Sequence, residues 1–160
     1  MLKNLKLTTK FSLMLMIVFV SGILISGAAL SKALEHRAEK EVTSQALLLI
    51  QTMSAVRTYT SEHINPLLTP RLDSEPVFIP ETVPAYSATE VFENLRNNGE
   101  YRNFFYKEAT LNPTNLRDKA DSFETKIVER FRNEPQTKEI SGFRTIPGGE
   151  LFYIARPLAV

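Results

Sequence analysis

The chain has 160 residues, enough for one domain and a short accessory segment. Its 19 basic and 18 acidic residues are interspersed and give a formal net charge of +1, so no basic face for nucleic acid is expected. The sequence has no cysteine, which excludes disulfides, thiolate catalysis, thiolate zinc sites and covalent haem attachment within these residues.

The first 31 residues are typical of a membrane anchor. Residues 1–10 are basic, and residues 11–31 form an uncharged apolar run between Lys10 and Lys32. A helix of that length spans roughly 30 Å, the thickness of the hydrocarbon core of a bilayer, so the lipid bilayer is an expected partner. A cleaved signal peptide begins in the same way, but its apolar region is usually about 7 to 15 residues long.

The charges that flank the apolar run predict its orientation. Lys3, Lys6 and Lys10 precede it with no acidic residue among them, whereas "KALEHRAEKE" behind it balances its charges. The positive-inside rule therefore places the N-terminus in the cytoplasm and everything after Lys32 on the outer side.

Residues 32–68 are predicted to continue as one long helix outside the membrane. Apolar residues recur every three or four positions from Leu34 to Tyr59, with charged residues between them. The stripe fits either a homodimer seam against a second copy of the chain or a face packed on the domain that follows. Pro66 and Pro70 are expected to end this helix.

Residues 69–160 carry a mixture of helix and strand signals. The prolines spaced along residues 71–84 predict an extended segment over a core. "SATE" is typical of a capping box, in which Ser87 and Glu90 begin a short helix that stops near Gly99. "YRNFFYKEAT" is interpreted as a strand because aromatic residues dominate it.

The remaining elements have stronger signals. "LNPTN" has the composition of a turn, and "ADSFETKIVERFRNEP" is an amphipathic helix that Pro135 closes. "KEISGFRTI" and "ELFYIARPLAV" are predicted to pair as a hairpin across "PGG". The fold class is therefore α+β, with helices packed on an antiparallel sheet. Only about three strands are found where a sheet usually has about five, so the domain is expected to be incomplete at its C-terminus.

Catalytic motifs are absent from the sequence. It has no G-x-S-x-G, no Gly-rich phosphate loop and no H-E-x-x-H, so we predict no enzymatic activity unless the native chain continues into an output domain. Of the two histidines, His36 lies among charges beyond the apolar run and His63 lies at the predicted end of the long helix. His63 is a candidate ligand-binding residue, with a helix C-terminal cap as the alternative role.

Further candidate ligand-binding residues lie in "FFYKEATLNPTNLRDKADSFE". Those whose polar side chains would form the lip of a pocket are Tyr106, Lys107, Asn112, Asn115 and Arg117. Asn112 and Asn115 equally suit a turn, where one of them caps the following helix. Arg156 is a candidate partner for a ligand acid, and a protein carboxylate is the alternative.

Four stretches carry a resemblance to a known family: "VPAYSATEVFENLR", "FFYKEATLNPTNLRDKADSFE", "IVERFR" and "GGELFYIARPLAV". Over about residues 42–160 the chain resembles the membrane-anchored, PAS-like sensor domains of bacteria. These carry covalent c-type haem and stand in front of histidine kinases, nucleotide cyclases or diguanylate cyclases. The resemblance implies a single-pass protein of the bacterial inner (cytoplasmic) membrane, with its C-terminal domain in the periplasm.

The sequence departs from that family in one respect. The C-x-x-C-H motif that attaches the haem follows the Arg-Pro strand in the family and is not found in these 160 residues. The resemblance therefore implies haem only for a chain that continues, and we expect these residues to hold no cofactor. The sequence predicts a membrane-anchored extracytoplasmic sensory domain for haem, redox or small-ligand signals. The alternative is a small single-pass membrane interaction protein, or a truncated fragment without ligand.

Overall fold

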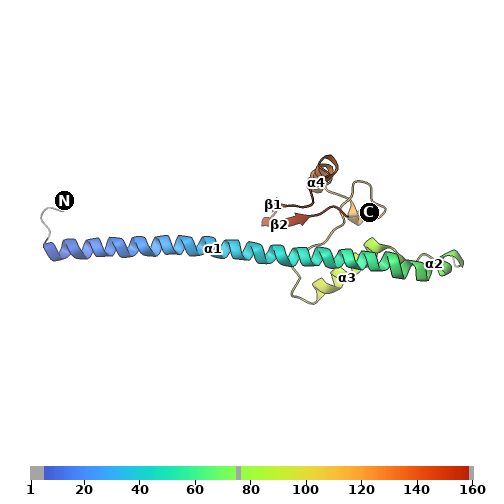
Figure 1. Ribbon diagram of the computed structural model, residues 1–160, viewed down its shortest axis with the longest axis horizontal. Helices are drawn as coiled ribbons and strands as arrows, with labels where there is room; N and C mark the ends of the chain where they lie inside the picture. Colours follow the sequence, from blue (N-terminus) through green and yellow to red (C-terminus); the bar gives the residue numbers. More distant parts are fainter. Residues whose placement is uncertain (1–5, 75–76, 159–160) are drawn as a thin grey trace. The chain divides into compact units, whose positions relative to one another are not determined.

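A computed structural model describes residues 6–74 and 77–158; Lys3, used to predict the orientation, and Pro76, one of the prolines of the predicted extended segment 71–84, lie outside them. The described chain contains helices and a two-stranded antiparallel sheet, which confirms the α+β class (Figure 1). It divides into two compact units, Met1–Ser44 and Gln45–Val160, which we describe separately. The division predicted from the sequence, into residues 1–10, 11–31, 32–68 and 69–160, stays a prediction.

The first unit is the N-terminal part of helix α1, which runs from Leu7 to Tyr59. Mean hydropathy reaches 2.5 over an 18-residue window near the N-terminus, and none of that window is buried. Among the described residues this is the one helix long and apolar enough to cross a membrane, although a signal sequence has the same properties. A helix whose apolar residues are exposed all round is the kind that a bilayer covers.

In the second unit the helix does not end at Pro66 or Pro70, so that prediction was wrong. A π-helical turn, η2 (Thr60–Ile64), follows α1, and helix α2 (Asn65–Ser74) contains Pro70. Proline has no N–H and its ring clashes with the carbonyl four residues back in an α-helix. The N–H of Asn65 donates to the carbonyl of Thr60, five residues back, and this wider turn accommodates Pro66.

The start of the next helix also differs from the prediction. A 3₁₀ turn, η3 (Pro80–Thr82), leads directly into helix α3 (Pro84–Asn97), so the segment is not extended throughout. Proline is favoured at the first helical position, where no N–H is needed. Ser87 forms no cap, because its hydroxyl donates to the carbonyl of Glu81 at 3.0 Å.

The main core of the second unit lies between α1 and α3. Met53, Ala88 and Phe92 are buried there, with four half-buried residues around them: Leu49, Val56, Phe104 and Tyr106. The segment "YRNFFYKEAT" was predicted to be a strand but is not: residues 104–109 are irregular and Thr110 makes only an isolated parallel bridge to Lys119.

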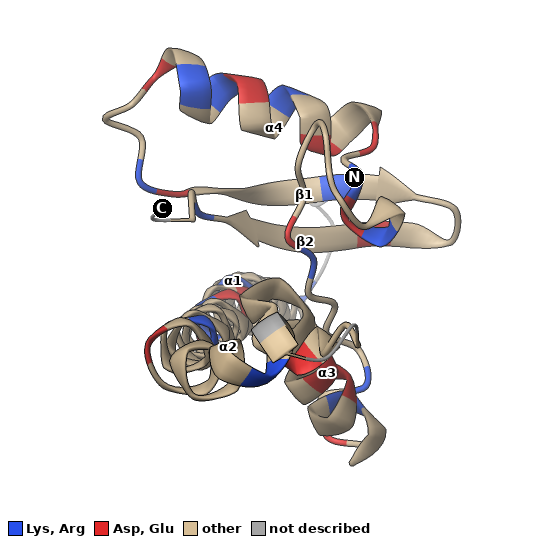
Figure 2. Cartoon of the chain, turned by 90° about the vertical axis from the view of Figure 1, so that its right-hand side faces the viewer, with Lys and Arg blue, Asp and Glu red and all other residues tan. Residues whose placement is uncertain are grey.

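The C-terminal elements agree with the prediction. Helix α4 (Ser122–Asn133) precedes strands β1 (Ile140–Ile146) and β2 (Gly149–Ala155), which pair antiparallel with Ile146 opposite Gly149. The two-residue connection contains Gly148, whose φ of 106° is a conformation that favours glycine. Helix α4 lies along one side of the hairpin (Figure 2). The rings of Phe123 and Tyr153 pack edge to face with their centroids 5.0 Å apart, and this contact packs α4 on the sheet.

Candidate functional site

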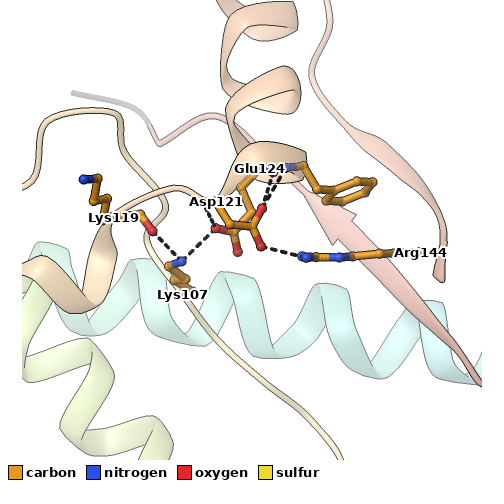
Figure 3. Close-up of polar contacts among 6 residues, drawn as sticks. Lys107, Lys119, Asp121, Glu124 and Arg144 are labelled. Carbon is orange, nitrogen blue, oxygen red and sulfur yellow. Dashed lines mark hydrogen bonds and ion pairs between the residues drawn. The ribbon is translucent and has the colours of Figure 1, made fainter. Parts of the chain in front are cut away.

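Residues 104–110, which we call the junction segment, connect α3 to the rest of the unit. Phe104 and Tyr106 pack against the core between α1 and α3. Lys107 points to the other side, where it contacts α4 (Figure 3). Alternation of this kind is a property of extended backbone, in which successive side chains leave on opposite sides. The junction segment therefore contacts helix α1 and helix α4 at the same time.

On the core side, Glu108 accepts hydrogen bonds at both carboxylate oxygens. The hydroxyl of Tyr106 donates to Oε1 at 2.8 Å, and Arg57 on α1 donates to Oε2 and forms an ion pair. The Glu108 side chain is only 7% exposed, whereas that of Arg57 is 27% exposed. Burial, reinforced by the charge of Glu108, raises the pKa of Tyr106 well above its usual value. The phenol thus remains a hydrogen-bond donor at physiological pH.

On the opposite side, Lys107 joins two more segments. Its Nζ donates to the backbone carbonyl of Lys119 at 2.7 Å and to Oε2 of Glu124 at 2.7 Å (Figure 3). The Lys107 and Glu124 side chains are 32% and 23% exposed, so water only partly screens this pair.

The first turn of α4 is held by a capping box. Asp121 Oδ1 accepts from the N–H groups of Phe123 and Glu124, both at 2.8 Å, and Glu124 Oε2 accepts from the N–H of Asp121 at 2.9 Å. Arg144 on β1 donates to Asp121 Oδ2 at 2.7 Å. The bond from the Glu124 N–H, with that from Arg144, lowers the pKa of Asp121. In the sequence this box is "DSFE", which has the same spacing as "SATE", where a capping box was predicted.

Residues 110–120 form a closed loop. Its two ends are joined by the N–H of Thr110, which donates to Asp118 O, and the N–H of Ala120, which donates to Thr110 O, both at 2.9 Å. Asn115 caps the 3₁₀ turn η4 (Leu116–Asp118) by accepting from the Arg117 N–H at 3.1 Å. Compact loops with joined ends are often functional, and this one presents Asn112 and residues 114–117 to solvent.

The predicted site residues fall into two groups. The Tyr106 hydroxyl, the Lys107 ammonium group and the Asn115 side-chain oxygen form hydrogen bonds within the chain, and Arg117 pairs with Glu90 on α3 at 3.4 Å. These four lie on the junction segment and the loop, together with Asn112.

His63 and Arg156 lie apart from the loop. The exposed His63 is in η2, with its ring 5.1 Å from that of Tyr59. Arg156 pairs with Glu139, with Nε at 2.8 Å from Oε2, so its predicted carboxylate partner is a protein side chain. Two shallow hollows, both open to solvent, lie away from the loop on the described chain, and Arg156 lines one of them. Their residues are Ser61, Asn65, Pro66, Thr69 and Pro70 for the first, and Lys138, Glu139, Arg156 and Pro157 for the second.

Sequence reasoning missed Arg57, Glu108 and Asp121. Arg57 and Glu108 are 51 residues apart in the chain, and one sequence carries no signal that pairs them. Asp121 could have been found from its capping-box spacing.

The fold and its junction define an α+β unit in which one extended segment links a closed loop to the long helix. The chain belongs to the Tll0287-like family, whose model matches residues 35–160. No curated protein and no solved structure matches the chain. The family match establishes membership, and an activity has to be argued from the residues.

Proposed function

We propose that the chain is a membrane-anchored, extracytoplasmic sensory domain of a signal-transduction protein. The observation that carries this proposal is the continuity of α1. The same helix, Leu7–Tyr59, contains the apolar span and, in residues 45–59, one side of the core of the second unit. Its basic N-terminal flank favours an outward second unit. In a bacterium that unit would lie in the periplasm, anchored in the inner membrane.

We further propose that the loop 110–120 contacts a small ligand. Support comes from its joined ends and from the exposure of Asn112, whose amide can both donate and accept. Tyr106, Lys107 and Asn115 would then act by holding the loop, because the Tyr106 hydroxyl, the Lys107 ammonium group and the Asn115 side-chain oxygen each form a hydrogen bond within the chain. We propose no catalytic step for these residues.

A covalent c-type haem does not fit these residues. Its attachment needs two thiols and an iron-ligating histidine, and the sequence has no cysteine. His63 is exposed beside Tyr59, and the hollow nearest to it in sequence, at Ser61–Pro70, is open to solvent. The proposed function therefore does not depend on haem held by this segment.

The orientation is tested by reporter fusions to the full chain after Val160. A reporter enzyme that folds only outside the cytoplasm should be active, and one that works only in the cytoplasm should be inactive. The reverse pattern would reject an extracytoplasmic unit.

Ligand binding is tested by native mass spectrometry of the chain extracted from membranes in mild detergent. The proposal expects a small-molecule adduct that Asn112→Ala reduces. Detection of only the unliganded mass would reject small-ligand binding and favour a role in association with another copy of the chain.

An exposed face of α1 favours a second role, association with another copy of the chain. Leu48 is 63% exposed and Tyr59 is 57% exposed, and with Thr52 and Ala55 they follow the spacing of one helix face. We propose this face as a homodimer seam. Leu48→Cys should form a crosslink in membranes, whereas Ser54→Cys, exposed on another face, should not. Equal crosslinking of both variants would argue against a defined seam.

A further inference from the structure

We propose that the contact of Glu108 with Arg57 couples the closure of loop 110–120 to helix α1. Opening the loop would weaken the Arg57–Glu108 contact, and breaking that contact would favour opening of the loop. Its role in signalling rests on the proposed function, but the coupling itself needs no stimulus and is tested without one.

The coupling begins with the position of Glu108 in the chain. Glu108 lies two residues before Thr110, whose N–H and carbonyl both take part in closing the loop. The backbone between them is too short to let one move far while the other stays in place, since two residues span at most about 7 Å. A displacement of Thr110 therefore reaches the Glu108 carboxylate.

The burial of Glu108 makes that displacement costly. Its side chain is 7% exposed and both carboxylate oxygens are bonded, one to Tyr106 and one to Arg57. A buried carboxylate that loses its partners keeps the cost of desolvation without the compensating bonds. Glu108 and Arg57 are thus expected to move together, and Arg57 belongs to α1.

Lys107 connects the junction segment to the other end of the loop. It donates to the carbonyl of Lys119, next to Ala120, and to Glu124 in the first turn of α4 (Figure 3). Successive residues of the junction segment therefore bind α1 through Glu108, and α4 and the loop end through Lys107. Opening the loop would disturb both contacts, which gives the segment two arrangements, closed and open.

The test is hydrogen exchange of the full chain in nanodiscs of phosphatidylethanolamine and phosphatidylglycerol. The reporters are the amides of Thr110 and Ala120, which close the loop, read relative to the amide of Phe92 in the core helix α3. Arg57→Met should raise the exchange of the two loop amides relative to Phe92 by roughly tenfold, within the usual range for coupled sites. Arg57→Lys, which keeps a positive charge, should lie closer to the wild type.

Val56→Ala is the matched control. Val56 packs on the core from the adjacent position of α1, but it has no charge that could pair with Glu108. It should leave the ratio unchanged. If Arg57→Met fails to fold, Glu108→Gln provides the same comparison. The coupling is overturned if neither variant raises the loop-to-core ratio above that of Val56→Ala.

Coupling is reciprocal, so a second measurement starts from the loop. Asn115→Ala removes the cap of η4 and should speed solvent exchange of the Arg57 guanidinium protons, observed by NMR. Unchanged guanidinium exchange would contradict the coupling. None of these outcomes depends on membrane orientation, so the reporter fusions can fail or succeed separately.

Discussion

Arg57→Met should lower the free energy of unfolding much more than Glu108→Gln, although each variant removes one partner of the Arg57–Glu108 pair. In Arg57→Met, Glu108 is left 7% exposed with only Tyr106 as a partner. Breaking a fully buried pair in this way costs about 3 to 5 kcal/mol, and we expect about 2 to 3 kcal/mol because Arg57 is 27% exposed. In Glu108→Gln the guanidinium can turn toward water and the amide still accepts from Tyr106. We therefore expect a loss of about 1 kcal/mol.

The double variant Arg57→Met with Glu108→Gln distinguishes this explanation from simple loss of packing. It has no stranded charge, so it should be more stable than Arg57→Met alone. Because the chain has no tryptophan, unfolding of the detergent-solubilised protein is followed in urea by tyrosine fluorescence. A double variant no more stable than Arg57→Met would refute the reasoning, since the buried charge would then not be the source of the cost.

Three further predictions concern the core, the α4 cap and the buried tyrosine. Phe92→Ala should cost about 3 to 5 kcal/mol of unfolding free energy in the same assay, since Phe92 is 1% exposed, and a loss below about 1 kcal/mol would contradict its place in the core. Asp121 has a lowered pKa when folded, so its stabilising contribution is present above the ordinary pKa near 4 and is lost as the pH falls through the lowered value; Asp121→Ala should flatten the acid limb of a stability–pH curve. Tyr106 has a raised pKa in the folded protein, so its contribution to stability is complete below pH about 10 and is lost as the pH rises beyond it. Tyr106→Phe should remove that alkaline loss of stability. An unchanged alkaline limb of the stability–pH curve would contradict the burial of the phenol.

The C-terminal elements could be predicted because their signals are local. Helix α4 has apolar residues at helical spacing, and the hairpin has two apolar runs around Pro147 and glycines. The apolar run near the N-terminus was equally evident, because hydropathy alone identifies it.

The errors occurred where tertiary structure overrides local pattern. Pro66 signals a helix end, but a π turn that packs against its neighbours lets the helix continue. The aromatic residues 104–106 suggest a strand, but no strand lies beside them among the described residues. Phe105 is instead 70% exposed, with the Arg96 guanidinium 4.7 Å from its ring centre. Arg57 and Glu108 are brought together only by the tertiary structure, so their pairing could not be predicted from the sequence.

The central claim is that the second unit faces outward from a membrane-anchored helix. Because the chain has no cysteine, Thr114→Cys on the exposed loop and Thr9→Cys near the N-terminus give clean labelling sites. With a membrane-impermeant maleimide on intact spheroplasts, we predict labelling at position 114 at once and at position 9 only after lysis. Labelling of position 9 alone in intact spheroplasts, with position 114 protected until lysis, would contradict the account.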